Sequence, residues 1–246
     1  MAKPFEVRAE IESEASPEEV WDAIATGRGM DAWFMGTNEI DPRLGGAAKT
    51  TFAGGFAVES KITNWDPPRR FVTEAEGEDG RLMAFEFVIE GRGAGKTLIR
   101  LVHSGFLPDA DWEREFEGLK VGDPAYLQKL GQYLKYFRGR TATPIAAYGP
   151  KVERERAWSV FKRALGLKGD AVEGAPVSAD LEGLPAIDGV VDYVSPDFLG
   201  VRTPDALYRF IHGFDGTIVL GHHIFAPVDQ KATERAWQSW VEAAFA

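Results

Sequence analysis

Apolar and polar residues alternate along several segments of the first half of the chain, which is the pattern of a strand with one buried face. Residues 5–12, 56–62 and 83–89 all alternate in this way. Clusters of glycine and proline separate these segments and predict turns between them. The region from 45 to 101 is therefore expected to form a run of antiparallel strands.

Two segments instead carry apolar residues at helical spacing. Ser16, Pro17 and Glu19 predict the start of a short helix, because serine and glutamate satisfy amides of the first turn and proline has none to satisfy. Large apolar residues recur every three or four positions between 127 and 137, which predicts one face of a long helix. A sheet with one apolar face must bury it, and this helix is the natural cover.

The second half of the chain repeats this pattern. Residues 45–68 align without a gap on 173–196 when Gly46 is placed on Gly174, an offset of 128 residues. Farther along, the segment ending at His103 aligns with the segment ending at His222. Similar segments in the same order, each on the same kind of element, indicate an internal duplication.

The duplication predicts an α+β protein of two tandem domains, each an antiparallel curved sheet closed by a long C-terminal helix. The first domain is expected over 1–140 and the second over 145–246, with 141–144 as a linker. Apolar residues at helical spacing between 236 and 244 predict the second closing helix. The second copy is smaller because its hairpins are shorter, and whether it contains a cavity is left open.

Five segments of the first half resemble one known family in the right order. They are residues 16–21 (SPEEVW), 32–34 (AWF), 41–46 (DPRLGG), 65–71 (WDPPRRF) and 97–106, which ends in HSGF. With the helix at 127–136, they resemble the SRPBCC, or START/Bet v 1-like, superfamily, and within it the group named after the activator of Hsp90 ATPase. The resemblance implies a helix-grip fold that encloses a cavity. Relatives include lipid and hormone binders, polyketide cyclases and chaperone-associated domains, so the fold does not select a function.

Composition and charge narrow the possible partners and metal sites. The 246 residues carry a formal net charge of −10, which disfavours a nucleic-acid partner, and 0 cysteines, which excludes disulfides and thiolate metal sites. Neither a signal peptide at the N-terminus nor an apolar run long enough for a membrane span is expected, so the predicted location is the cytoplasm. No cofactor is predicted.

Candidate chemistry centres on histidine. His103 is in phase with Ile99 and Leu101, on the face that the closing helix should cover. It is a candidate for orienting a ligand or donating a proton, with Tyr133 as a second candidate, but a hydrogen-bonded core histidine is the favoured interpretation. The predicted ligand-binding residues are Trp33, Phe56, Met83, Phe85, Phe87, His103, Leu130, Tyr133, Leu134 and His222.

Three other motifs are set aside. Residues 91–97 resemble a phosphate-binding loop, but the glycine is one position too close and the segment joins two strands, so a hairpin turn is expected. His222 and His223 point to opposite faces of a strand, so no metal site is predicted. The acidic residues Asp109, Asp111, Glu113, Glu115 and Glu117 are expected on a solvated surface.

Three functions remain open from the sequence. The favoured one is non-catalytic binding of a small apolar molecule, lipid-like or polyketide-like, in the cavity. The first alternative is an enzyme of cyclase or hydrolase type that uses the same cavity. The second is a protein-interaction module, such as a chaperone partner, which predicts a filled interior and an exposed apolar patch.

Overall fold

The computed structural model describes residues 2–77, 79–93, 95–110 and 112–246. Asp111 of the acidic segment lies outside the described residues, as does Ala94 of the 91–97 turn. The chain divides into two compact units, Met1–Thr141 and Ala142–Ala246, and each is described by itself.

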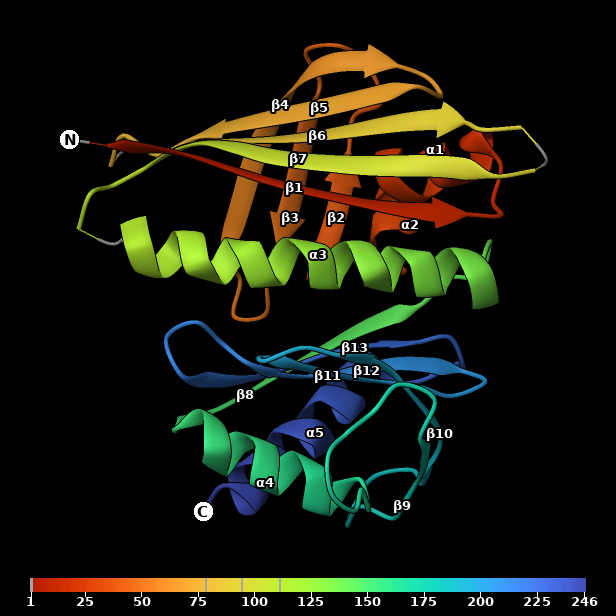
Figure 1. The fold of residues 1–246 in the computed structure, drawn as a ribbon, viewed down its shortest axis with the longest axis vertical. Helices are drawn as coiled ribbons and strands as arrows, with labels where there is room; N and C mark the ends of the chain where they lie inside the picture. The colour runs from red at the N-terminus through yellow and green to blue at the C-terminus, as the bar shows by residue number, and fades with distance from the viewer. Residues whose placement is uncertain (1, 78, 94, 111) are drawn as a thin grey trace. The chain divides into compact units, whose positions relative to one another are not determined.

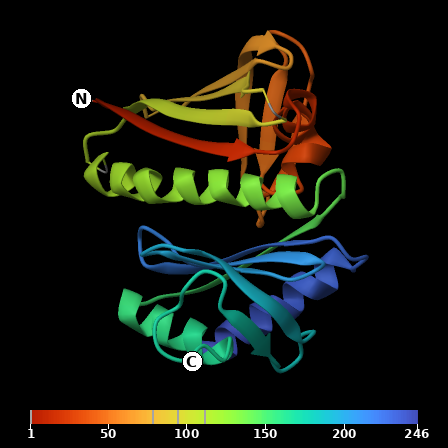
Figure 2. The same ribbon diagram turned by 45° about the vertical axis from the view of Figure 1, so that its right-hand side comes forward.

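The first unit is a seven-stranded antiparallel sheet with a long helix along it (Figure 1). The strands are β1 (Lys3–Ser13), β2 (Thr37–Ile40), β3 (Ala47–Thr51), β4 (Ala57–Asp66), β5 (Arg70–Glu76), β6 (Leu82–Gly91) and β7 (Thr97–Leu107). Their order across the sheet is β1-β7-β6-β5-β4-β3-β2. The helices are α1 (Pro17–Ala25), α2 (Gly27–Met30) and α3 (Trp112–Tyr136). Figure 2 shows the first sheet from a second direction, with α3 again running along it.

Local sequence signals account for these elements. The Ser16 hydroxyl accepts a hydrogen bond from the Glu19 amide at 3.3 Å, and the Glu19 carboxylate accepts one from the Ser16 amide at 2.8 Å, so α1 starts with the predicted capping box. The segment at 91–97 is the turn between β6 and β7, as predicted, and not a phosphate loop.

The second unit has the same order of elements in a shorter form. Its strands are β8 (Thr143–Lys151), β9 (Pro176–Ala179), β10 (Ile187–Val194), β11 (Phe198–Arg202), β12 (Ala206–His212) and β13 (Thr217–Ile224). They form a six-stranded antiparallel sheet in the order β8-β13-β12-β11-β10-β9. The helices are α4 (Arg154–Ala164) and α5 (Gln230–Ala244). In this fully described unit, α2 and β2 have no counterpart, which confirms that the second copy is smaller.

Strand register shows how closely the two units correspond. In the first unit one row across the sheet runs from Val7 through His103, Phe85 and Thr73 to Ile62. The corresponding row of the second unit consists of Ile145, His222, Tyr208, Val201 and Val191. His103 and His222 therefore occupy equivalent positions, and the fold class predicted from the duplication is confirmed.

The predicted alignment of the two copies is wrong by one residue. In the first copy the Gly45 amide donates to the Ile62 carbonyl, and in the second the Gly174 amide donates to the Val191 carbonyl, both at 2.8 Å. Gly45 and Gly174 both have positive φ, 79° and 85°. The true offset is therefore 129 residues, because the equivalent glycine is Gly45 and not Gly46.

The predicted linker at 141–144 is also partly wrong. Thr143 and Pro144 belong to β8, where Pro144 pairs with His223. β8 is an edge strand and has only one neighbour in the sheet. Proline is tolerated there because an edge strand does not need all of its amides as donors.

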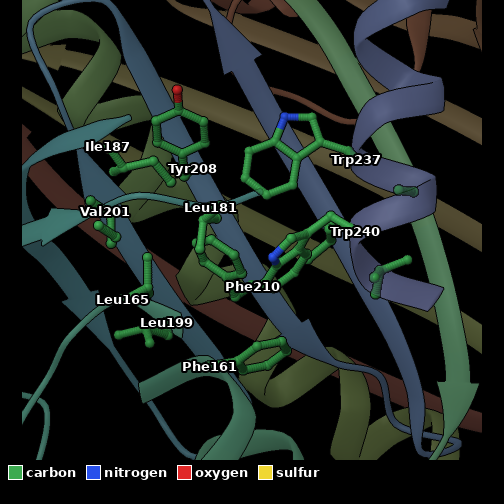
Figure 3. Close-up of a cluster of buried hydrophobic side chains, with 14 of the residues drawn as sticks. Phe161, Leu165, Leu181, Ile187, Leu199, Val201, Tyr208, Phe210, Trp237 and Trp240 are labelled. Carbon is green, nitrogen blue, oxygen red and sulfur yellow. The ribbon is translucent and has the colours of Figure 1, made fainter. Parts of the chain in front are cut away.

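The interior of the second unit is filled by large aromatic side chains (Figure 3). Phe161 of α4 contacts Phe210 of β12 with ring centroids 5.5 Å apart, and Trp237 and Trp240 of α5 lie 5.6 Å from each other. Trp237 is 2% exposed and Phe210 is fully buried. The interior of the second unit is therefore a closely packed core.

Candidate functional site

The first unit holds a cavity of about 320 Å³ between the inner face of its sheet and α3. The wall is formed by the segment around α2 and β2, by strands β3 to β7 and by the middle of α3. Its larger apolar and aromatic members are Met30, Trp33, Phe34, Phe71, Met83, Phe85, Phe87, Leu101, Tyr126 and Leu127. This volume is at the small end of the range for ligand pockets, roughly 300–1,000 Å³.

Five predicted ligand-binding residues line this cavity: Trp33, Met83, Phe85, Phe87 and His103. Trp33 is held in place because its indole N–H donates to the Ala23 carbonyl at 2.9 Å. Phe85 and Phe87 come from alternate positions of β6 and therefore face the same side of the sheet.

Phe56 does not line the cavity, contrary to the prediction. It lies just before β4 in the turn that contains Gly54 and Gly55, both of which have positive φ. The turn takes Phe56 out of the alternating pattern, so its ring is 69% exposed and stacks on Phe52 with centroids 5.9 Å apart.

Leu130, Tyr133 and Leu134 are also absent from the cavity wall. All three are buried on α3, but this half of the helix packs directly against β1: a Cβ added at Gly131 would lie 3.2 Å from the Ile11 side chain. The Tyr133 hydroxyl accepts a hydrogen bond from the Gly139 amide at 3.2 Å, just after the helix ends. Burial raises the pKa of the Tyr133 phenol, and nothing in this arrangement supports an acid–base role.

His103 is the most distinctive group in the wall. It is 1% exposed, and its Nδ1 lies 2.9 Å from the Asp123 carboxylate of α3. The ring stacks on Phe85 with centroids 3.7 Å apart and meets the edge of Phe5 at 5.0 Å. Its other nitrogen, Nε2, is buried and has no hydrogen-bond partner.

Asp123 was missed by the sequence analysis. It lies four residues before Leu127 and seven before Leu130, on the apolar face of the helix, and it is 8% exposed. A carboxylate in an apolar stripe is the signal that could have identified it, because such a group is rarely buried without a partner.

Two other polar residues of the wall, Asn38 and Thr50, are bonded to each other, and Asn38 is also bonded to Asp31. Asn38 donates from its side chain to the Asp31 carboxylate at 3.0 Å and accepts from the Thr50 hydroxyl at 2.7 Å. Burial raises the pKa of the Asp31 carboxyl. Among the described residues of the wall, His103 alone has a buried side-chain nitrogen or oxygen without a partner.

His222, the predicted site residue of the second unit, has different surroundings. Its Nδ1 accepts the backbone amide of Arg209 at 3.1 Å, and its ring lies 4.2 Å from Trp237. A neutral ring that accepts at Nδ1 carries its proton on Nε2. An open groove of about 500 Å³ lies at one end of this unit, with Tyr208 and Trp237 among its lining residues, but His222 is not in its wall.

Among the residues that the structure describes, no group of three or more histidine, cysteine, aspartate or glutamate side chains is placed to hold a metal ion. In the same part of the chain, every helix is too short or too polar to cross a membrane.

Residues 14–135 match the family model described as "Activator of Hsp90 ATPase homolog 1-like protein". This match covers the segments on which the resemblance was based, so the resemblance is confirmed for the first unit. No curated protein matches the chain in sequence.

Solved structures with similar folds fall into two groups. Protein MLL2253 from Mesorhizobium loti is 22% identical, with 54% of this chain and 98% of that chain covered and a TM-score of 0.48. The Aha1 dimer from Colwellia psychrerythraea is 23% identical, with coverage of 55% and 99% and a TM-score of 0.45. The di-domain ARO/CYC BexL from the BE-7585A biosynthetic pathway is 11% identical but matches along 96% of this chain and 93% of its own, with a TM-score of 0.50. The BexL match agrees with two tandem domains of this fold.

Proposed function

Because the first domain has the motifs and the fold of the Activator of Hsp90 ATPase homolog 1-like family, with a hollow interior, we propose that it binds a small hydrophobic ligand in this cavity. The observation that carries the proposal is the cavity of about 320 Å³ with a mainly aromatic and aliphatic wall. Apolar walls with a few polar groups are typical of ligand sites, because burial supplies affinity and the polar groups supply orientation.

The cavity favours ligand binding over a protein-interaction module, which predicts a filled interior. The corresponding interior of the second domain is packed with Phe161, Phe210, Trp237 and Trp240, and its groove of about 500 Å³ is open at one end of that domain. The first domain is therefore the proposed site of binding.

The test is native mass spectrometry of the purified chain beside its denatured mass, followed by thermal-shift screening with lipids and aromatic polyketides. We expect either an extra mass that is lost on denaturation or a rise in melting temperature. A ligand present at 100 times its Kd stabilises the folded state by about 2.7 kcal/mol. An apo mass together with no stabilisation by any compound of the panel would contradict the proposal.

A matched pair of variants on β4 tests whether the ligand binds in this cavity. Ser60 lines the cavity, whereas the adjacent Glu59 is exposed on the other face of the strand. Ser60→Phe is expected to fill the cavity and abolish binding, and Glu59→Phe is expected to leave it unchanged. Equal effects of both substitutions would contradict binding in this cavity.

A second candidate function is an enzyme of cyclase or hydrolase type. The contact between His103 and Asp123 favours it, because a histidine oriented by a carboxylate is a common acid–base arrangement. BexL, whose fold is similar along the whole chain, carries ARO/CYC in its name. This candidate predicts turnover of a bound polyketide that His103→Gln abolishes while ligand binding and folding persist.

A further inference from the structure

The wall of the proposed cavity contains one unusual polar group, the imidazole of His103. This side chain is 1% exposed, and its Nε2 atom is buried without a hydrogen-bond partner. A buried polar atom without a hydrogen bond is unfavourable and calls for an explanation. A ligand group that bonds to Nε2 supplies one.

The tautomer of His103 follows from its other contact. Nδ1 lies 2.9 Å from Oδ2 of Asp123, and one proton joins them. Imidazole is a stronger base than a carboxylate, and an ionised carboxylate only accepts hydrogen bonds. The proton therefore lies on Nδ1, and the neutral ring presents a lone pair at Nε2.

The orientation of the ring is also fixed before any ligand binds. Phe85 stacks on it with an angle of 22° between the ring planes, and Phe5 meets it at 86°. Asp123 is itself buried, so its charge is close to the ring and poorly screened by water. Positive charge that develops on the imidazole is therefore stabilised by this carboxylate.

We propose that His103, positioned by Asp123, binds through Nε2 the acidic hydroxyl of a small aromatic ligand, a phenol or an enol. This inference rests on the proposed function and names the class of ligand that the cavity selects. The hydroxyl donates to the Nε2 lone pair, and the bond strengthens as its proton is shared with the ring, because charge-assisted hydrogen bonds are the stronger ones. The rings of Trp33, Phe85 and Phe87 in the wall provide face and edge contacts for the aromatic part of the ligand.

Two probes of nearly the same shape test this directly. 2-Naphthol carries an acidic hydroxyl, whereas 2-methoxynaphthalene has the same rings and no hydrogen to donate. Isothermal titration of the full chain is expected to give a Kd for 2-naphthol that is lower by about tenfold or more, as a hydrogen bond to a charge-stabilised group implies.

Substitution of Asp123 tests its role in this preference for a hydroxyl. Asp123→Asn removes the charge that stabilises a proton on His103 and is expected to reduce the preference for 2-naphthol to less than about threefold. Glu113→Gln is the matched control, because Glu113 is an exposed carboxylate on the same helix, and it should leave the preference intact. Binding of 2-methoxynaphthalene should be equal in both variants and in the wild type.

The ¹⁵N spectrum of the wild-type imidazoles keeps the test decisive if Asp123→Asn fails to fold. We expect the Nδ1–H tautomer for His103 and a shift of its Nε2 signal when 2-naphthol is added. An Nε2–H tautomer, or equal affinity of the wild type for the two probes, would overturn the role of the pair and leave the cavity proposal standing. Failure of both probes to bind would overturn this ligand class, whereas the cavity proposal itself is decided by the mass and thermal-shift measurements described above.

Discussion

A larger side chain at Gly122 of α3 should raise the free energy of unfolding if the cavity beside it is empty and lower it if that space is filled. Gly122 lies in the wall, and a Cβ added to it would meet no atom within 4 Å. Glycine inside a helix is less favourable than alanine by about 0.8–1.0 kcal/mol. Gly122→Ala is therefore expected to raise the free energy of unfolding of the first domain by nearly this amount.

Gly122→Leu should add to this gain. Leucine is also a good helix former, and burying its side chain is worth up to about 1.5–3 kcal/mol when the surroundings have room for it. We expect the leucine variant to be more stable than the alanine variant by 1 kcal/mol or more, as an estimate of about half of full burial. In a closely packed interior the same change would cost about 1–3 kcal/mol.

Hydrogen exchange of the β7 amides in the full chain measures this stability, since core strands exchange through unfolding of the domain. A gain of about 1.4 kcal/mol slows exchange tenfold. The leucine variant should also lose 2-naphthol binding, whereas the alanine variant should keep it. A leucine variant less stable than the alanine variant would refute the reasoning, because it would mean that the space beside Gly122 is filled.

Three further predictions concern contacts elsewhere. Arg81 donates two hydrogen bonds to Glu115 of α3, one of them from Nη2 at 3.0 Å, so Glu115→Gln should speed hydrogen exchange in the first half of α3 by about fivefold, for a loss of up to about 1 kcal/mol; unchanged exchange would show that the pair does not hold the helix. Trp237→Ala should lower the free energy of unfolding of the second domain by about 3–5 kcal/mol, measured by hydrogen exchange of the β13 amides in increasing urea. A loss below about 1 kcal/mol would contradict the packed core. A hydrogen bond from Lys151 is the main reason that the pKa of Asp215 falls from 3.8 to about 2, so its contribution to stability is present above pH 4 and is lost as the pH falls through about 2. Because the pair is near the surface, the wild type should exceed Asp215→Asn by no more than about 1 kcal/mol at pH 6, and this difference should be much smaller at pH 2. An equal difference at the two pH values would contradict this assignment.

The fold was predictable because its local signals agree with its overall architecture. The capping box at Ser16 and the alternation along β6 each specify an element without reference to distant residues. The alignment of the copies failed by one residue because matching glycines were placed together, whereas the backbone requires positive φ at Gly45 and Gly174. Hydrogen bonding across strands determines this register, and a single sequence does not record it.

The site was predictable only in part. Alternation along β6 and β7 identified Phe85, Phe87 and His103, because strand periodicity assigns a face. Periodicity does not show where a strand begins, so it assigned Phe56 to a strand although this residue lies in the preceding turn. The apolar stripe on α3 identified buried positions but not which of them line the cavity. It did not identify Asp123, because a pattern of apolar residues does not include a carboxylate on the same face.

The two histidines show how one fold position supports two different interiors. His103 and His222 occupy the same place in the row across their sheets, and each contacts a residue of the closing helix of its domain. In the first domain α3 presents Asp123 to the ring, which puts the proton on Nδ1 and gives the cavity an acceptor. In the second, α5 presents Trp237, and the backbone amide of Arg209 bonds to Nδ1, which places the proton on the other nitrogen. The second histidine is a core residue that accepts a backbone hydrogen bond at Nδ1, whereas the first lies in the wall of a cavity with a carboxylate at Nδ1. A residue on the closing helix, and not the histidine itself, therefore distinguishes the two interiors.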